Sequence, residues 1–157
     1  LACRVITRPC DAASEEHDSL SEAAFAEAQA DGAFAVAWDA HGLKYGLPAS
    51  VDETIAAGQV AIANVSRSAM AALKARYANM IVVEITASPE ILAERLAARG
   101  REAREDVIAR LARAVPTVSL ACDIVRIDNS GMREEAGDRL VAAIRRAIAF
   151  ADVSDAV

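Results

Sequence analysis

Residues 38–48 read WDAHGLKYGLP, and this stretch says more about the fold of the chain than any other. Two runs that read as short strands, 33–39 and 43–47, flank the pair His41-Gly42. A glycine between two such runs favours a tight turn, so the pattern predicts a β-hairpin that carries Tyr45. Taken alone, the stretch describes no more than a turn beside a packed tyrosine.

Short apolar runs alternate with helical patterns over the rest of the chain. The expected strands are 3–7, 60–65, 80–86 and 123–127. The expected helices begin after the capping patterns Ser19-x-x-Glu22, Ser50-x-x-Glu53 and Ser88-Pro89-Glu90, and also cover 68–78, 104–114 and 134–150. This alternation predicts a three-layer α/β sandwich around a parallel sheet.

The composition limits the classes of protein that fit. With 157 residues, 54% hydrophobic content and 4% aromatic residues, the chain is expected to form one domain of helices packed on a sheet. A net charge of −6 argues against a nucleic-acid-binding surface. No apolar run is long enough to span a bilayer, and three cysteines without metal spacing suit a reducing cytoplasm.

Charge is distributed unevenly along the chain. Residues 95–113 contain six arginines and three acidic residues, which gives this segment a net charge of +3. A local basic patch in an acidic chain suits a small anionic ligand such as a polyphosphate.

Three stretches, taken in order, carry a family resemblance. Ile6-Thr7-Arg8-Pro9, residues 38–48 and Ala63-Asn64-Val65-Ser66-Arg67 resemble the acceptor-binding half of the guanylate-kinase-like P-loop kinases, and most closely their ribose 1,5-bisphosphate phosphokinase branch. The resemblance covers nearly the whole chain. It implies one domain over residues 1–157, of the nucleoside-monophosphate-kinase type, with an acceptor-binding insertion at 11–57 and a helical lid at 95–113.

One element of that family is missing from the sequence. The chain contains no G-x-x-x-x-G-K-[ST] phosphate loop. A parallel sheet without its central strand would leave backbone donors and acceptors unpaired. We therefore expect the first strand and the phosphate loop to precede Leu1 in the natural protein.

The resemblance assigns acceptor-binding residues. It implies a phosphate clamp at Thr7 and Arg8, and further substrate contacts from Glu15, His41, Tyr45, Asn64, Ser66 and Arg67. A guanidinium can grip a phosphate through two parallel hydrogen bonds. The structural alternatives are a polar loop at Glu15 and a helix cap at Ser66.

The resemblance also assigns catalytic and nucleotide-binding residues. It implies that lid arginines neutralise the phosphoryl group in transit, namely Arg95, Arg99, Arg110 and Arg113. It implies that the nucleotide contacts Arg99, Asp128, Asn129 and Ser130. The structural alternatives are a solvated helix face and a turn. The two histidines, His17 and His41, give no metal spacing, so Mg²⁺ is expected to be held by ATP and the phosphate loop.

The expected reaction is ATP-dependent phosphorylation of ribose 1,5-bisphosphate to 5-phosphoribosyl 1-diphosphate. Leu47 and Pro48 stand where guanylate kinases carry guanine-reading hydroxyls, which argues against GMP as acceptor. Two alternatives stay open: a guanylate kinase or related sugar-phosphate kinase, and a non-catalytic binding module of this fold. The expected partners are ATP and a phosphorylated sugar, without nucleic acid or membrane, and a homodimer also stays open.

Overall fold

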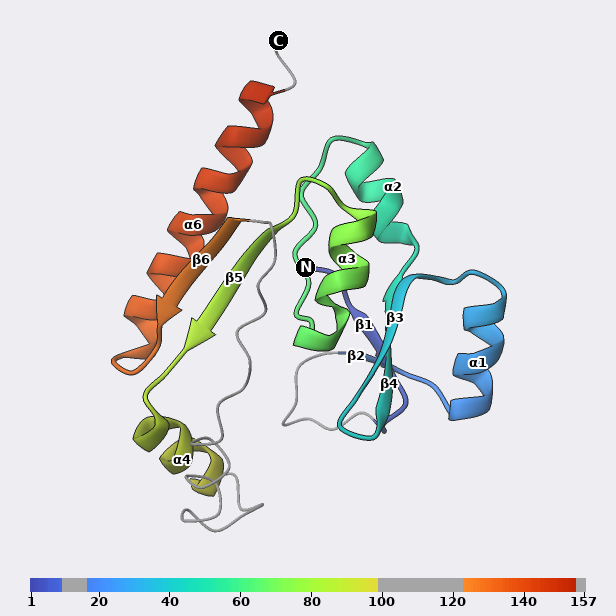
Figure 1. Cartoon of the computed structure of the whole chain (residues 1–157), viewed down its shortest axis with the longest axis horizontal. Coiled ribbons are helices and arrows are strands. Elements are labelled where there is room, and N and C mark those ends of the chain that lie inside the picture. Colours follow the sequence, from blue (N-terminus) through green and yellow to red (C-terminus); the bar gives the residue numbers. More distant parts are fainter. Residues whose placement is uncertain (10–16, 99–122, 155–157) are drawn as a thin grey trace. The chain divides into compact units, whose positions relative to one another are not determined.

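The computed structural model describes residues 1–9, 17–98 and 123–154, and these form two compact units (Figure 1). The first unit is Leu1–Ala78 and the second is Asn79–Val157. The expected arrangement of one domain with an insertion at 11–57 and a lid at 95–113 stays a prediction. We describe each unit by itself.

A four-stranded mixed sheet forms the centre of the first unit. Its strand order is β2-β1-β4-β3, with β1 parallel to β2 and antiparallel to β4, and β3 antiparallel to β4. The strands are β1 (Arg4–Ile6), β2 (His17–Ser19), β3 (Phe34–Ala40) and β4 (Leu43–Pro48). The predicted hairpin is confirmed as β3–β4. The strand expected at 3–7 is also confirmed, but it pairs within this mixed sheet.

Helix α1 (Glu22–Ala30) packs on one side of the sheet, and α3 (Met70–Arg76) lies on the other side (Figure 1). Ser21 caps α1, since its side chain accepts a hydrogen bond from the backbone N–H of Ala24 at 3.2 Å. The prediction of a cap at Ser19 is therefore wrong. Ser19 is unavailable because it pairs in β2 and donates its hydroxyl to the carbonyl of Arg8.

Three polar side chains tie α2 (Ser50–Ala56) to the end of α3. Arg76 donates two hydrogen bonds to the carboxylate of Asp52, and the Tyr77 hydroxyl donates a third at 2.8 Å. The bond from Arg76 holds the pKa of Asp52 below its usual range, whereas burial raises the pKa of Tyr77. The predicted cap at Ser50 is wrong, because Ser50 is already the first helical residue and its N-cap is Ala49.

The strand expected at 60–65 is absent from the structure. These residues precede a short 3-10 helix, η1 (Arg67–Ala69), without strand geometry. A strand needs a neighbouring ladder, and the structure records one backbone hydrogen bond for this segment outside helices and strands, from Ala2 N–H to the Ile62 carbonyl. Val60 and Ile62 accordingly stay 46% and 38% exposed, where a buried strand was expected.

The second unit contains a parallel strand pair. Strands β5 (Ile81–Thr86) and β6 (Asp123–Asp128) run in register from Ile81↔Asp123 to Thr86↔Asp128. Helix α4 (Pro89–Ala98) begins where predicted, with the Ile91 N–H bonded to the Ser88 hydroxyl at 3.4 Å. Helix α6 (Arg133–Ser154) contacts β6. Among the described helices, none is long and apolar enough to cross a membrane.

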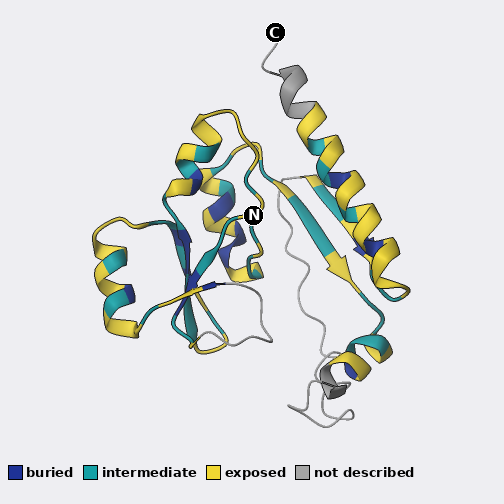
Figure 2. Ribbon diagram, turned by 180° about the vertical axis from the view of Figure 1, so that it is seen from behind, coloured by how far each residue is buried: buried dark blue, intermediate teal, exposed yellow. Residues whose placement is uncertain are grey.

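In the core of the first unit, the backbone of β4 at Gly46 packs closely against the aromatic ring of Phe34. Buried residues of this unit gather on the strands and on α3, as Figure 2 shows. Gly46 on β4 lies against Phe34, which stacks on Phe25 of α1 with ring centroids 4.6 Å apart. A Cβ added at Gly46 would lie 2.5–2.8 Å from the Phe34 ring.

Gly46→Ala should therefore destabilise the protein by about 1–3 kcal/mol, because the Phe34 ring cannot move without disturbing Phe25. The measurement is the urea midpoint of unfolding. Gly137→Ala in α6 is the matched control, since its added Cβ meets nothing within 4 Å and alanine favours the helix. Equal midpoints for the two variants would contradict the packing argument.

Candidate active site

Thr7 joins the end of β1 to the start of β4. The Thr7 N–H donates to the Lys44 carbonyl at 3.1 Å, and the Thr7 hydroxyl oxygen accepts from the Lys44 N–H at 2.9 Å. A hydroxyl that accepts one bond keeps its own hydrogen for donation. Thr7 is thus held two residues from the β3–β4 turn, with a donor that can still serve a ligand.

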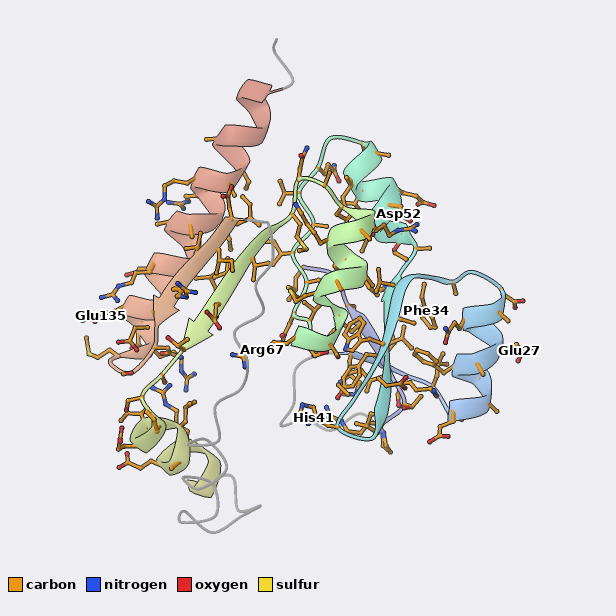
Figure 3. The ribbon with its side chains drawn as sticks, in the orientation of Figure 1. Glu27, Phe34, His41, Asp52, Arg67 and Glu135 are labelled. Carbon is orange, nitrogen blue, oxygen red and sulfur yellow. The ribbon has the colours of Figure 1, made fainter. Side chains whose placement is uncertain are left out.

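The β3–β4 turn is as tight as the sequence predicts. Ala40 pairs with Leu43, so His41 and Gly42 alone make the connection. Both have positive φ angles, 53° and 74°, as two-residue type I′ turns require. His41 is exposed at the tip of the hairpin (Figure 3).

Helix η1 is hydrogen-bonded to β3 next to the same turn. Ser68 donates its hydroxyl to the Asp39 carbonyl at 3.2 Å and also lies 2.8 Å from the Ser66 hydroxyl. Ser66 is the N-cap residue of η1 but makes no side-chain capping bond. One end of the mixed sheet therefore brings together four predicted site residues: Thr7, His41, Ser66 and Arg67. Asn64 lies two residues before Ser66 and is exposed.

One face of the sheet carries a stack of two aromatic rings and a guanidinium. Directly paired residues on neighbouring strands point to the same face, and the register pairs Ile6 with Tyr45 and Tyr45 with Trp38. The Trp38 and Tyr45 rings stack at 5.5 Å with an angle of 9° between them. The Arg4 guanidinium lies over the Tyr45 ring, 5.7 Å from its centroid.

Arg8 lies two residues beyond the last residue of β1. Its Nε is excluded from water and has no hydrogen-bond acceptor among the described residues. The Trp38 Nε1 is in the same condition. Buried donors are nearly always satisfied, so these two N–H groups indicate that an acceptor is supplied from elsewhere.

Comparisons with known proteins identify the family. The chain is 47% identical over 156 residues to a ribose 1,5-bisphosphate phosphokinase from Chelativorans sp., a match that covers 99% of this chain and 75% of that protein. It is 46% identical over 143 residues to a protein of the same name from Agrobacterium fabrum, covering 91% and 78%. The chain belongs to the ribose 1,5-bisphosphate phosphokinase family. No family model matches the chain.

The fold is also found in a solved structure. The crystal structure of guanylate kinase from Anaplasma phagocytophilum superposes with a TM-score of 0.66 and 19% identity, covering 92% of this chain and 73% of that one. The predicted fold class, a P-loop kinase-like α/β fold related to guanylate kinase, is therefore confirmed.

Within this phosphokinase family fold, the loop after β6 forms a second candidate region. The carboxylate of Asp128 accepts hydrogen bonds from the N–H and the hydroxyl of Ser130, at 2.9 and 2.6 Å. The Ser130 hydroxyl also accepts from the Ser88 N–H at 2.8 Å, which joins the loops after β5 and β6. The bonds from Ser130 hold the pKa of Asp128 below its usual range.

Asn129 lies between these two residues and is anchored by its backbone. Its N–H donates to the Thr86 carbonyl at 2.7 Å. Its side-chain oxygen is buried and has no hydrogen-bond partner in the part of the chain that the structure describes. The loop is thus built rigidly around one unmatched polar group, as a ligand contact would require. Its assignment to the nucleotide stays a prediction.

The remaining predicted site residues are less informative. Arg95 is exposed on α4. Glu15, Arg99, Arg110 and Arg113 lie outside the described residues. Their assigned roles stay predictions, as do those of the residues described above.

Sequence reasoning missed three residues of the aromatic face as site candidates: Arg4, His17 and Trp38. His17 pairs in register with Arg4 and is 6% exposed. The alternation along β1 and β4 could have placed Arg4 and Tyr45 on one face, but only the strand pairing shows it. His17 could not have been found, since no pattern predicted β2.

The described residues contain no group of three His, Cys, Asp or Glu side chains that could hold a metal ion.

Proposed function

We propose that the intact protein transfers the γ-phosphoryl group of MgATP to ribose 1,5-bisphosphate. An oxygen of the acceptor's 1-phosphate forms a bond to the γ-phosphorus, and the bond from that phosphorus to the β,γ-bridging oxygen breaks. The products are 5-phosphoribosyl 1-diphosphate and MgADP. No covalent enzyme intermediate is needed, since positioning and charge neutralisation carry phosphoryl transfer.

One observation carries the proposal: near-half identity, over almost the whole chain, to relatives named for this activity. A match of that extent includes all three stretches on which the resemblance was drawn. The Agrobacterium fabrum and Chelativorans sp. proteins bear the same name. The geometry at the end of the mixed sheet supports the proposal independently.

In this proposal the acceptor phosphate binds between Thr7, Arg8 and Tyr45. Thr7 is immobilised by its two bonds to Lys44, which makes its hydroxyl a preorganised donor. The Arg8 Nε needs an acceptor, and a phosphate oxygen supplies one. The Tyr45 ring is held by stacking on Trp38, so its hydroxyl is positioned before the acceptor binds.

The other acceptor contacts and the nucleotide side remain part of the same proposal. Glu15, His41, Asn64, Ser66 and Arg67 complete the acceptor site, and Asp128, Asn129 and Ser130 contact the nucleotide together with Arg99. Arg95, Arg99, Arg110 and Arg113 neutralise the moving phosphoryl group. Mg²⁺ would enter with ATP as part of the nucleotide substrate and would neutralise charge on its phosphates.

The proposed compartment is the cytoplasm, where MgATP is abundant. The reaction needs ATP and a phosphorylated sugar as its partners. It requires neither nucleic acid nor a membrane, and the acceptor contacts named above come from one chain.

Acceptor choice tests the proposal. The intact protein should show kcat/KM for ribose 1,5-bisphosphate about 10²-fold or more above that for GMP. The reason is that Leu47 is 2% exposed and pairs across the sheet with Val36, so this position packs in the core and offers no hydrogen bond to a base. Steady-state kinetics with both acceptors at saturating MgATP is the measurement.

Each rival function gives a different outcome of the same assay. A higher kcat/KM for GMP would replace the proposal with a guanylate kinase. Binding of ribose 1,5-bisphosphate without turnover of either acceptor would replace it with a non-catalytic binding module.

A further inference from the structure

Arg4 is the charged residue of the aromatic face that the reaction proposed above leaves without a role. It lies on β1, four residues before Arg8, and its guanidinium is held over the Tyr45 ring. Tyr45 in turn stacks on Trp38. The side chain is only partly exposed and is fixed on a strand in the middle of the sheet order, not on a loop.

The register places these groups on one face. Ile6 pairs with Tyr45, and Arg4 is two residues before Ile6, so Arg4 and Tyr45 share the face that also carries Trp38. Arg4 pairs in register with His17 of β2, whose side chain is buried. A cation and an imidazole therefore lie side by side, next to the tyrosine assigned to the acceptor phosphate.

The spacing of the two arginines along the chain leaves room for a ligand with two anionic ends. Arg4 begins β1 and Arg8 lies two residues beyond its last residue, Ile6, so their Cα atoms are at most about 13 Å apart. Both side chains are long enough to reach toward a ligand bound between them. A phosphate at the Arg4 end would form charge-assisted hydrogen bonds with the guanidinium, and these are stronger than the bonds that a neutral nucleobase would accept.

We propose that Arg4, together with His17, forms a second phosphate subsite that binds the 5-phosphate of ribose 1,5-bisphosphate while the Thr7–Arg8 clamp holds the 1-phosphate. This inference rests on the proposed function and names the feature of the site that selects a bisphosphate. Arg4 is then a specificity-determining residue, because a second phosphate gains more binding energy from it than a base in that position would.

Binding measurements with two sugars test the subsite. Arg4→Gln should raise the Kd of the intact protein for ribose 1,5-bisphosphate by about 10- to 100-fold, the usual size of a lost charge-assisted contact. It should leave the Kd for ribose 1-phosphate unchanged, because that sugar has no 5-phosphate. Titration calorimetry without nucleotide gives both constants. Unchanged ribose 1-phosphate binding also shows that the variant is folded.

Two further variants sharpen the result. Arg4→Lys keeps the charge but loses the two-pronged geometry, so it should recover part of the bisphosphate affinity. Arg145→Gln removes one arginine from the exposed side of α6 and should change neither constant.

Three outcomes would overturn the inference. Equal weakening of both sugars by Arg4→Gln would mean that Arg4 supports the clamp or the fold. No weakening of either would mean that Arg4 touches no ligand. A wild-type protein that binds both sugars equally would have no second subsite. Bisphosphate selectivity in binding without phosphorylation would instead overturn the proposed function and leave the subsite standing.

Discussion

Arg8→Ala is expected to lower kcat/KM for ribose 1,5-bisphosphate by about 10²- to 10³-fold. The Arg8 Nε–H is excluded from water and has no acceptor among the described residues, so it can donate a hydrogen bond to a bound ligand. Its backbone is fixed, because the Arg8 carbonyl accepts the Ser19 hydroxyl and Thr7 is bonded to Lys44. An alanine at this position would keep these backbone hydrogen bonds and would remove only the guanidinium group.

The control for this variant is Arg145→Ala on the exposed surface of α6, which should keep wild-type kinetics and a wild-type unfolding midpoint. Arg8→Lys should recover only part of the loss, since an ammonium binds phosphate through one point. If Arg8→Ala retains wild-type kcat/KM, the clamp does not hold the acceptor phosphate, and the Nε–H must have another partner.

Arg110→Ala is expected to lower kcat by about 10³-fold or more while changing the acceptor KM far less. An arginine that meets the phosphoryl group mainly in the transition state contributes to kcat, whereas equal contact in the ground state would appear in KM. The motivation is the net charge of +3 over residues 95–113 and the place of Arg110 in the predicted lid. Steady-state kinetics of the intact enzyme, with each substrate varied in turn, separates the two parameters.

Arg104→Ala is the matched control within the same arginine-rich segment and should have a small effect on both parameters. A wild-type kcat in Arg110→Ala would withdraw the catalytic assignment and favour a solvated helix face instead. A rise in KM with unchanged kcat would assign Arg110 to ground-state substrate binding.

Local rules were sufficient for the elements whose stability is decided by neighbours in sequence. His41-Gly42 predicted the two-residue turn because few residue pairs accept two positive φ angles, and Ser88-Pro89 predicted the start of α4 because both residues suit a helix N-terminus. Strands at 80–86 and 123–127 were also predicted, and both are found, paired in parallel as β5 and β6. The expected burial of 80–86 on both faces is not found in the described residues, since Ile81 and Ile85 are 41% and 54% exposed.

Local rules failed where a distant strand competes for the same residue. Ser19 has the capping pattern, but it pairs with β1 as part of β2 and is not available to cap a helix. Ser21 caps α1 instead. Residues 60–65 have the composition of a strand, but composition provides no ladder partner, and the structure gives them no strand geometry before η1.

By itself, therefore, the sequence determined the turn of the hairpin, the start of α4 and the family, because each of these is recorded in short runs of residues. Only the tertiary structure decided which side chains share a site. Strand register set Arg4 over Tyr45 and Tyr45 against Trp38, and the hydrogen bonds of Thr7 and Ser68 joined three distant segments around one turn. Such neighbours depend on which strands pair and in which register, and pairing is a property of the assembled sheet, not of any one segment.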